Sequence, residues 1–183
     1  MDGPLKRTLG AWKNTGMAIR DIRTMGDPVL RTACEPIVDV DDVVRTLVED
    51  LLETVDQDGR AGLAANQIGV GLRAFSWNIE GDVGYILNPV IVEASEEKQE
   101  IADEGCLSIP GLWFECDRPL FARAEGINLD GELVVVEGEE IWARLIHHEV
   151  DHLDGFLFVD RLAKDVKRKA MREIREALEH EYS

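Results

Sequence analysis

The chain has 183 residues, of which 45% are hydrophobic and 31% are charged, and its formal net charge at pH 7 is −17. This composition excludes a disordered or fibrous protein, and no apolar run approaches the roughly 20 residues that a membrane-spanning helix needs. Three cysteines are too few for a disulfide framework and suit a reducing compartment. No continuous apolar region follows the basic residues of the first sixteen positions, so we expect a cytoplasmic protein without a secretory signal.

Residues 1–16 show no amphipathic period and contain three glycines and a proline. We therefore expect a loosely ordered extension in front of a single domain that spans residues 17–183. From 41 to 56 the apolar residues recur at helical spacing, and Asp41 or Asp42 is placed to cap the first turn. This segment is predicted to be a helix.

Between about 70 and 137 the pattern changes to short runs such as RAFSWNI, GYILNPVIV, EGINLD and ELVVVE, which glycine, asparagine and asparagine-proline turns separate. These runs predict strands in antiparallel hairpins. A helical period returns from about Glu139 and stops near Gly155, and a last helix is expected from about Lys164 to Glu179. The predicted architecture is one α+β domain.

The sequence His148-Glu149-Val150-Asp151-His152 lies on the first of these two late helices. Two imidazoles four residues apart share one helix face, so they can hold a single metal ion. Glu149 can reach the edge of that metal and take a proton from water. The alternative is a pair of surface histidines. Apolar residues surround the motif and favour burial, where an unsatisfied glutamate would cost several kcal/mol.

A catalytic metal site needs a third protein ligand and an open position for water. Phe158 occupies the place where one zinc-peptidase pattern has a third histidine. Glu173 is close to the spacing of a zinc endopeptidase ligand, but its segment reads as a separate basic helix. Cys106 lies in a tight-turn sequence, residues 103–111, that could hold a thiolate beside the metal helix. We prefer Cys106 as the ligand over its alternative role as a buried core residue.

A third segment, GLAANQIG at residues 62–69, combines small side chains with the amide of Gln67. Small residues such as Gly62 let a ligand or a backbone approach closely, and Gln67 can donate hydrogens to a developing oxyanion. The alternative is a connection between a helix and a strand that serves packing alone.

Together the three segments resemble the signature motifs of peptide deformylases, GLAAxQxG, EGCLS and HExDHLxG, in the order of that family. Residues 17–20 and 26–31 also resemble the family's opening. The resemblance implies antiparallel or mixed β-sheets around a central metal-binding helix, followed by a C-terminal helix. It implies a metallohydrolase that removes the N-formyl group from the initiator methionine of nascent polypeptides and releases formate.

Position by position, the resemblance implies a metal bound by Cys106, His148 and His152 and a catalytic Glu149. It also implies an oxyanion site made by the Gln67 side chain and the Leu107 backbone amide. A thiolate with two imidazoles accepts either Zn²⁺ or Fe²⁺, and the resemblance favours Fe²⁺.

Three positions depart from the family pattern. Arg60 stands where glycine is usual, His147 stands where glutamine is usual, and Trp113 lies near a position that is basic in some relatives. His147 points roughly 100° around the helix from His148, so we expect it to have a structural role. The departures at Arg60 and His147 also leave open a different class of protein, one that binds metal or formylated peptides without turnover.

Two further expectations concern the surroundings of the metal. Leu145 lies one turn before His148 on the metal-facing side, so it is expected to line an apolar pocket for the substrate methionine. Glu104 and Arg118 flank the Cys106 turn with opposite charges, and we predict a partly buried ion pair behind the metal ligands that fixes the turn against the rest of the domain. The alternative is that both side chains are separately solvated.

The charge is spread unevenly along the chain. Residues 32–160 carry 29 acidic and seven basic side chains, a balance that argues against binding DNA. The last helix instead gathers six basic residues, and we predict that it contacts ribosomal RNA, the alternative being a solvated face. These residues are Lys164, Lys167, Arg168, Lys169, Arg172 and Arg175.

Overall fold

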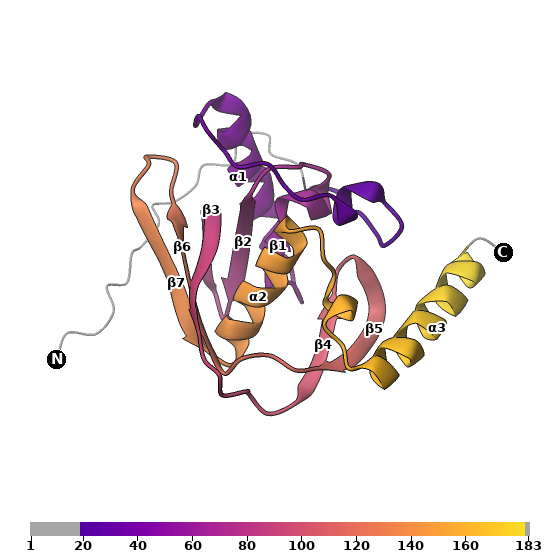
Figure 1. Ribbon diagram of the computed structural model, residues 1–183. Coiled ribbons are helices and arrows are strands. Elements are labelled where there is room, and N and C mark those ends of the chain that lie inside the picture. The colour runs from indigo at the N-terminus through magenta and orange to yellow at the C-terminus, as the bar shows by residue number, and fades with distance from the viewer. Residues whose placement is uncertain (1–18, 182–183) are drawn as a thin grey trace.

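The computed structural model describes residues 19–181, so the predicted extension at 1–16 lies outside the described residues. It confirms the α+β class, with helices and strands in the predicted order (Figure 1). In that part of the chain no helix is both long enough and apolar enough to cross a membrane. The elements are η1 (Pro28–Arg31), α1 (Asp42–Val55), β1 (Gly62–Ala64), η2 (Ala65–Ile68), β2 (Ala74–Ile79), β3 (Asp82–Ala94), β4 (Ala102–Cys106), β5 (Ile109–Cys116), β6 (Phe121–Ile127), β7 (Leu133–Glu139), α2 (Ile141–Leu153), η3 (Phe158–Asp160) and α3 (Lys164–Glu181).

The strands form one five-stranded sheet in the order β1-β2-β3-β6-β7 and a separate two-stranded sheet of β4 and β5. All neighbouring strands pair antiparallel, which confirms the predicted hairpins. Glu80 and Gly81 join β2 to β3 with φ angles of 52° and 84°. Two consecutive positive φ angles are typical of the tight turns that match the twist of antiparallel strands.

Helices α1 and α2 each bury an apolar stripe. Asp41 caps α1, because its side chain accepts a hydrogen bond of 3.0 Å from the Val44 amide. The buried stripe of α1 packs with β1, β2 and β3. Helix α2 contacts β1, β3, β6 and β7, and it lies among the strands in Figure 1. It ends at Leu153, and Gly155 just beyond the end has a φ of 81°, which suits glycine.

The segment around Cys106 is more regular than the predicted tight turn. Residues 102–106 form strand β4, and the turn itself consists of Leu107 and Ser108 between β4 and β5. The sequence DEG has low strand propensity, so pairing with the apolar strand β5 imposes the extended conformation. A register shift between Gly105 and Cys106 interrupts this pairing beside the turn.

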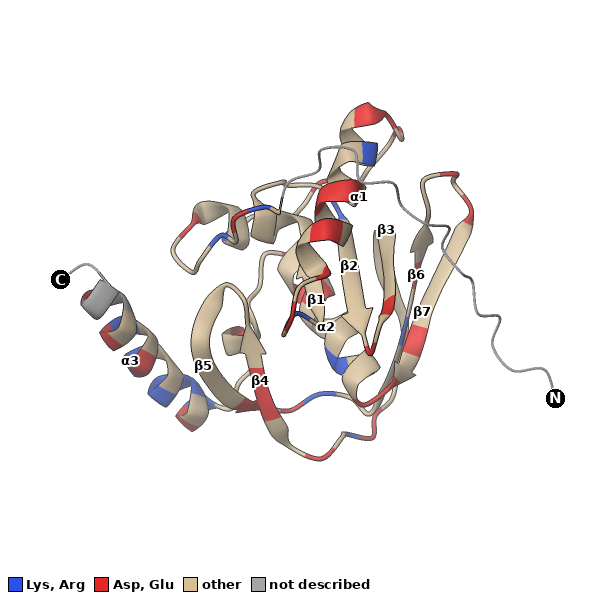
Figure 2. Cartoon of the chain, turned by 180° about the vertical axis from the view of Figure 1, so that it is seen from behind, with Lys and Arg blue, Asp and Glu red and all other residues tan. Residues whose placement is uncertain are grey.

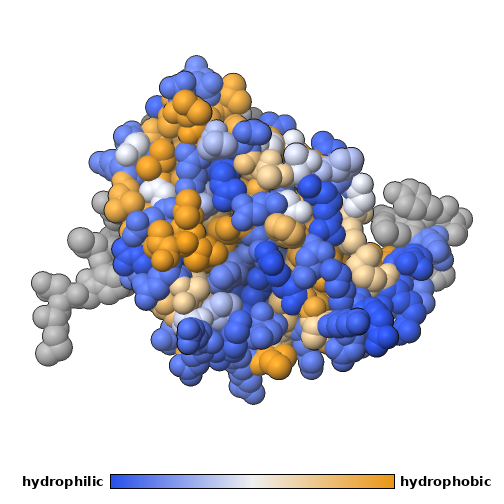
Figure 3. All heavy atoms as spheres, in the orientation of Figure 1, coloured by the Kyte–Doolittle hydropathy of each residue, from blue (hydrophilic) through white to orange (hydrophobic). Residues whose placement is uncertain are grey.

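Helix α3 lies at the edge of the molecule, beyond the β4–β5 hairpin and away from the five-stranded sheet (Figure 1). Its apolar residues Ala170 and Ile174 are buried in a core cluster that includes residues of β5 and η3. Figure 2 shows both signs of charge along α3, whereas the exposed side of α1 is mostly acidic. Figure 3 shows that the outward surface of α3 is largely hydrophilic.

Candidate metal centre

Three potential metal ligands meet between α2 and the end of β4. One sulfur atom from Cys106 and two ring nitrogens, from His148 and His152, all lie within 4.8 Å of one another. The Cys106 Sγ is 3.2 Å from the Nε2 of His152. Ligand atoms of a tetrahedral ion lie roughly 3–4 Å apart, given metal–ligand bonds of about 2.0–2.3 Å. The set therefore fits one ion, and the residues whose side chains the structure describes contain no other such group.

Glu104 orients His148 for this role. The Nδ1 of His148 lies 2.7 Å from Oε1 of Glu104, which leaves Nε2 available to a metal. Burial alone would raise the pKa of Glu104. The hydrogen bonds from His148 and Arg118 and the charges of these two residues lower it by more, so the pKa lies below its ordinary value. Glu104 therefore stays a carboxylate. The His148 ring also stacks on the ring of Phe158, with the two ring centroids 6.1 Å apart.

Glu104 and Arg118, which the sequence predicts to pair, form an ion pair with an Nη2–Oε1 distance of 2.7 Å. The pair is more deeply buried than predicted, because Arg118 is only 3% exposed and Glu104 only 2%. Arg118 also donates to Asp151 on α2 at 2.9 Å. Arg144 donates to the other oxygen of Glu104 at 2.9 Å. Three residues, Arg118, Arg144 and His148, thus hold the Glu104 carboxylate. Because Arg144 and His148 belong to α2, these bonds fix β4 against α2.

Glu149 is 3% exposed and lies at the pocket side of α2. Its Oε2 has no hydrogen-bond partner within the described part of the chain. Burial raises the pKa of Glu149 to about 7. A Cβ atom placed on Gly62 would lie only 2.4 Å from Oε1 of this carboxylate, so β1 approaches Glu149 as closely as a glycine allows. A buried acid with a free oxygen is suited to exchange protons with a bound reactant.

Gln67 lies on η2 and is 1% exposed. Its Oε1 accepts a hydrogen bond from the Ala64 amide at 2.9 Å, which fixes the direction of its NH₂ group. The Nε2 atom lies 3.1 Å from the Ser108 hydroxyl and 3.7 Å from the Cys106 sulfur. The amide hydrogens of Gln67 therefore point toward the metal ligands.

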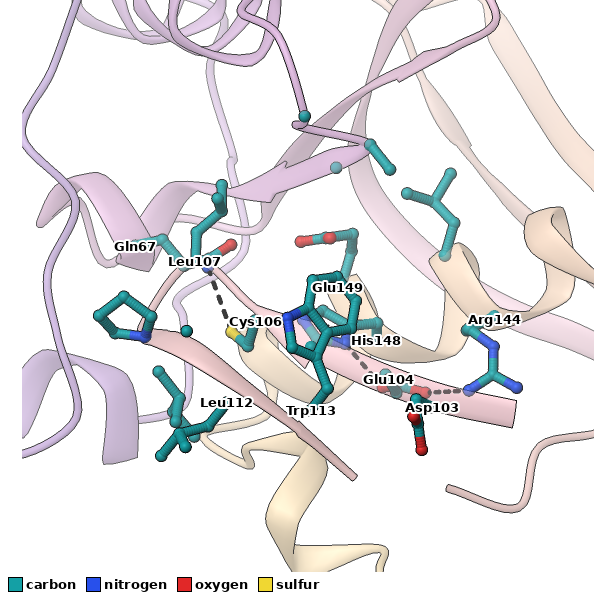
Figure 4. A pocket seen from close by; sticks show the side chains of 18 of the residues that line it. Gln67, Asp103, Glu104, Cys106, Leu107, Leu112, Trp113, Arg144, His148 and Glu149 are labelled. Atoms are coloured by element: carbon teal, nitrogen blue, oxygen red, sulfur yellow. Dashed lines mark hydrogen bonds and ion pairs between the residues drawn. The ribbon is translucent and has the colours of Figure 1, made fainter. Parts of the chain in front are cut away.

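These residues surround a pocket of about 420 Å³ (Figure 4). Its wall includes the predicted site residues Gly62, Gln67, Leu107, Leu145 and Glu149, together with Cys106, His148 and Glu104. The predicted residues His152 and Arg118 are buried outside this lining. The structure thus brings all of the predicted site residues together in one region.

Other cysteines and histidines lie outside the ligand group. Burial raises the pKa of Cys34 to about 11 and that of Cys116 to about 12, so both remain protonated thiols. Burial also lowers the pKa of His147, and the ligand group does not include it. Glu173, the alternative third ligand, lies on α3 and is 3.9 Å from Lys169. It does not belong to the ligand group either.

Two polar residues of the site have no counterpart among the predicted ones. Arg144 binds Glu104, and its spacing of four residues from His148 already places both on one helix face. Asn66 is fully buried and donates from Nδ2 to the His152 carbonyl at 2.6 Å. That bond joins residues 86 positions apart, and no local pattern signals it.

Comparisons with known proteins agree with this geometry. The family model for polypeptide deformylase matches residues 19–168. A peptide deformylase from Acidothermus cellulolyticus is 51% identical over 161 residues, which cover 88% of each chain. The crystal structure of a peptide deformylase from Legionella pneumophila superposes with a TM-score of 0.80 at 33% identity, covering 90% of this chain and 98% of that one. The enzyme from Thermotoga maritima gives a TM-score of 0.75 at 36% identity, with 80% and 99% coverage.

Proposed function

The chain belongs to the polypeptide deformylase family, and on that premise we propose that it removes the N-formyl group from the initiator methionine of nascent polypeptides and releases formate. The observation that carries the proposal is the pocket itself. It is lined by the proposed ligands Cys106 and His148 together with a buried carboxylate, Glu149, and an amide donor, Gln67. Amide hydrolysis needs an activated water, a proton acceptor and a hydrogen-bond donor for the oxyanion. A metal held by Cys106 and His148, the Glu149 carboxylate and the Gln67 amide would meet these three needs in turn.

We assign the metal to the Cys106 Sγ and to one ring nitrogen each of His148 and His152. The separation of these three atoms and the Glu104 hydrogen bond to His148 Nδ1 support this ligand set. When bound, the metal supplies Lewis-acid activation of water near neutral pH. The ligand chemistry accepts Zn²⁺ or Fe²⁺, and we propose Fe²⁺ from the family. Purification without oxygen followed by elemental analysis tests this assignment, since a chain that retains zinc and no iron would contradict it.

The chain's own residues divide the remaining work. Water adds to the formyl carbon, the C–N bond breaks, and the products are formate and a free amine. Glu149 takes a proton from the attacking water and passes it to the departing nitrogen, and its buried, unpartnered Oε2 supports this role. The Gln67 amide and the Leu107 backbone N–H donate to the oxyanion, a role that the direction of the Gln67 amide supports.

In this proposal the methionine side chain of the substrate packs against the apolar wall of the pocket near Leu145. Leu145 is 4% exposed and lines the pocket one turn before His148. Gly62 faces it, because a Cβ there would come within 2.4 Å of Leu145 Cδ1. A longer residue at either position would fill the space that the proposed methionine needs.

Formate release from formyl-Met-Ala-Ser tests the proposed activity. We expect turnover of this peptide and none of acetyl-Met-Ala-Ser or of an internal peptide bond. Glu149→Gln keeps the shape of the side chain but cannot accept a proton, so we expect it to retain metal and lose about 10²–10⁴-fold in rate. Metal content without formate release from the unmodified chain would instead identify a binding protein, and cleavage of internal bonds would identify an endopeptidase.

We further propose that the protein works in the cytoplasm and contacts the ribosome through α3. Lys164, Arg168, Arg172 and Arg175 follow one another at helical spacing along a single exposed stripe. Lys167 and Lys169 contribute less, because they contact Asp160 and Glu173. This stripe would attract the phosphates of ribosomal RNA, which the acidic remainder of the chain repels.

Charge reversal tests the ribosome contact. Arg168→Glu combined with Arg172→Glu is expected to weaken salt-sensitive cosedimentation with ribosomes while hydrolysis of free peptide stays nearly unchanged. The matched control is Arg45→Glu with Lys98→Glu, which changes the net charge equally but lies outside α3. Equal losses of ribosome binding in both double variants would show that net charge, and not α3, decides the association.

A further inference from the structure

Arg161, the residue after η3, binds from the molecular surface to α2, the helix that carries the two proposed histidine ligands. Its side chain is 45% exposed, whereas the side chain that it contacts, Asp151 of α2, is only 10% exposed. Nη2 of Arg161 donates to Oδ1 of Asp151 at 2.7 Å, and Nε donates to Oδ1 at 3.1 Å and to Oδ2 at 3.2 Å. The central carbon of the guanidinium also lies 4.8 Å from the centroid of the Phe156 ring. The carboxylate and the ring together hold this arginine in one place, although its side chain is partly exposed.

Asp151 links Arg161 to the interior of the candidate metal centre. Its Oδ2 accepts a hydrogen bond from Arg118 at 2.9 Å. Arg118 donates in turn to both oxygens of Glu104, at 3.0 Å and 2.7 Å, and Oε1 of Glu104 lies 2.7 Å from Nδ1 of His148 (Figure 4). The side chains of the residues that follow Arg161 in this series are all buried or nearly so. Polar contacts therefore run without interruption from the surface to a proposed metal ligand.

Two carboxylates share Arg118, and this sharing gives the outer contact its importance. Removing Arg161 would leave Arg118 as the one cation that the described side chains place on Asp151. A buried carboxylate is costly unless it is paired, so we expect Arg118 to move toward Asp151 and to loosen its bonds to Glu104. Glu104 orients the His148 ring, and replacing a residue in such a role typically changes metal affinity about 10–100-fold. The position of His148 should therefore depend on Arg161.

We propose that Arg161 is a positioning residue for the metal site and that it slows the loss of the ion by holding Asp151. The inference rests on the ligand set assigned under the proposed function. Arg161 neither belongs to that set nor lines the pocket, so we expect it to act on the metal through the intervening residues. Its effect should be smaller than that of a direct partner of His148, because residues along such networks typically change a coupling by about 2- to 30-fold.

Transfer of Co²⁺ from the loaded protein to excess chelator tests the proposal without any substrate. The decay of the visible cobalt–thiolate absorption gives the dissociation rate, and the shape of the spectrum reports the geometry of the ligands. We expect Arg161→Ala to change the spectrum and to raise the dissociation rate by about 2- to 30-fold. Arg161→Lys should recover only part of the difference, because lysine keeps the charge but not the planar fork of donors.

Arg20→Ala is the matched control. Arg20 is 48% exposed and pairs at 2.9 Å with Asp50 of α1, which is 12% exposed, so the pair has nearly the same exposure as the pair of Arg161 and Asp151. Neither residue of the control pair belongs to the ligand group. Arg20→Ala should lower Tm about as much as Arg161→Ala and leave the dissociation rate and the spectrum unchanged. Equal acceleration in both variants would show that lost stability releases the metal, and would overturn the proposal.

A double-mutant cycle with Asp151→Asn tests the route. Asp151→Asn alone should raise the dissociation rate, and adding Arg161→Ala should raise it little further, because the contact that transmits the effect is already weakened. An unchanged rate in Arg161→Ala, or full additivity of the two substitutions, would overturn the role of Arg161. Failure to bind Co²⁺ would overturn the ligand set and this inference with it. A chain whose Co²⁺ loss depends on Arg161 but which releases no formate from formyl-Met-Ala-Ser would support the inference and refute the deformylase function alone.

Discussion

Replacing Gly62 with alanine tests how closely β1 must approach Glu149, the proposed proton acceptor. The new Cβ would lie 2.4 Å from Glu149 Oε1 and 2.4 Å from Leu145 Cδ1, whereas ordinary contact begins at 3.4 Å. The strand or these side chains must therefore move by about 1 Å, and a misplacement of this size in an active site can cost about 10²-fold in rate. We expect kcat/KM for formyl-Met-Ala-Ser to fall by about that factor.

The predicted loss concerns catalysis more than metal binding. None of the three atoms nearest to the new Cβ belongs to Cys106, His148 or His152, so the metal content should stay unchanged. Overpacking typically costs about 1–3 kcal/mol of stability, which thermal unfolding would register as a lower Tm of a protein that still folds. Gly71→Ala is the matched control, since nothing lies within 4 Å of its added Cβ and its φ is not positive.

A double-mutant cycle identifies the cause of the loss. If Gly62→Ala acts by displacing Glu149, it should reduce the rate little further in a Glu149→Gln background, where the proton acceptor is already absent. Full additivity of the two substitutions would assign the effect to Leu145 and the substrate pocket. A folded Gly62→Ala protein with wild-type turnover would refute the reasoning as a whole.

Three further substitutions probe the metal centre. Cys106→Ala should lose most of the metal in elemental analysis, whereas Cys34→Ala should keep it, and a fully metallated Cys106→Ala protein would remove that residue from the ligand set. Gln67→Leu should lower kcat by roughly 10²–10³-fold without changing the metal content, because one proposed oxyanion donor is lost. Arg118→Met removes the most deeply buried cation that pairs with Glu104 and also its ion pair with Asp151, and should cost about 3–5 kcal/mol in the free energy of unfolding, which denaturant titration would measure.

The elements that the sequence predicts well are those with local signals. The apolar period of α1 and its capping aspartate locate that helix to within a residue at each end. The spacing of His148 and His152 predicts that they share a face of α2, and the structure brings their rings to 5.0 Å between centroids. Helical spacing of this kind depends only on residues that are close in the chain, so it can be recognised without knowledge of the tertiary structure.

The β4–β5 hairpin was harder to predict because its conformation depends on partners. Residues 103–106 contain two acids and a glycine, a composition typical of a turn, yet they pair with β5. Glu104 can be extended and buried there because Arg118, Arg144 and His148 satisfy its carboxylate. From the local sequence alone, burying Glu104 appears only as an unfavourable desolvation free energy. In the folded chain three partners from distant positions compensate that free energy.

The polar contacts that fix the ligands come from distant parts of the chain, and they explain why two motifs depend on each other. Asn66 holds the carbonyl of His152, while its neighbour Gln67 contacts Cys106 and Ser108. A single turn of 3₁₀ helix, η2, therefore bonds to both elements that carry the proposed metal ligands. A shift of η2 would move Gln67, the proposed oxyanion donor, together with the Asn66 side chain that holds the His152 carbonyl. The segment GLAANQIG at residues 62–69 thus supports the candidate metal centre and also lines the pocket. Only the folded chain reveals the first of these roles.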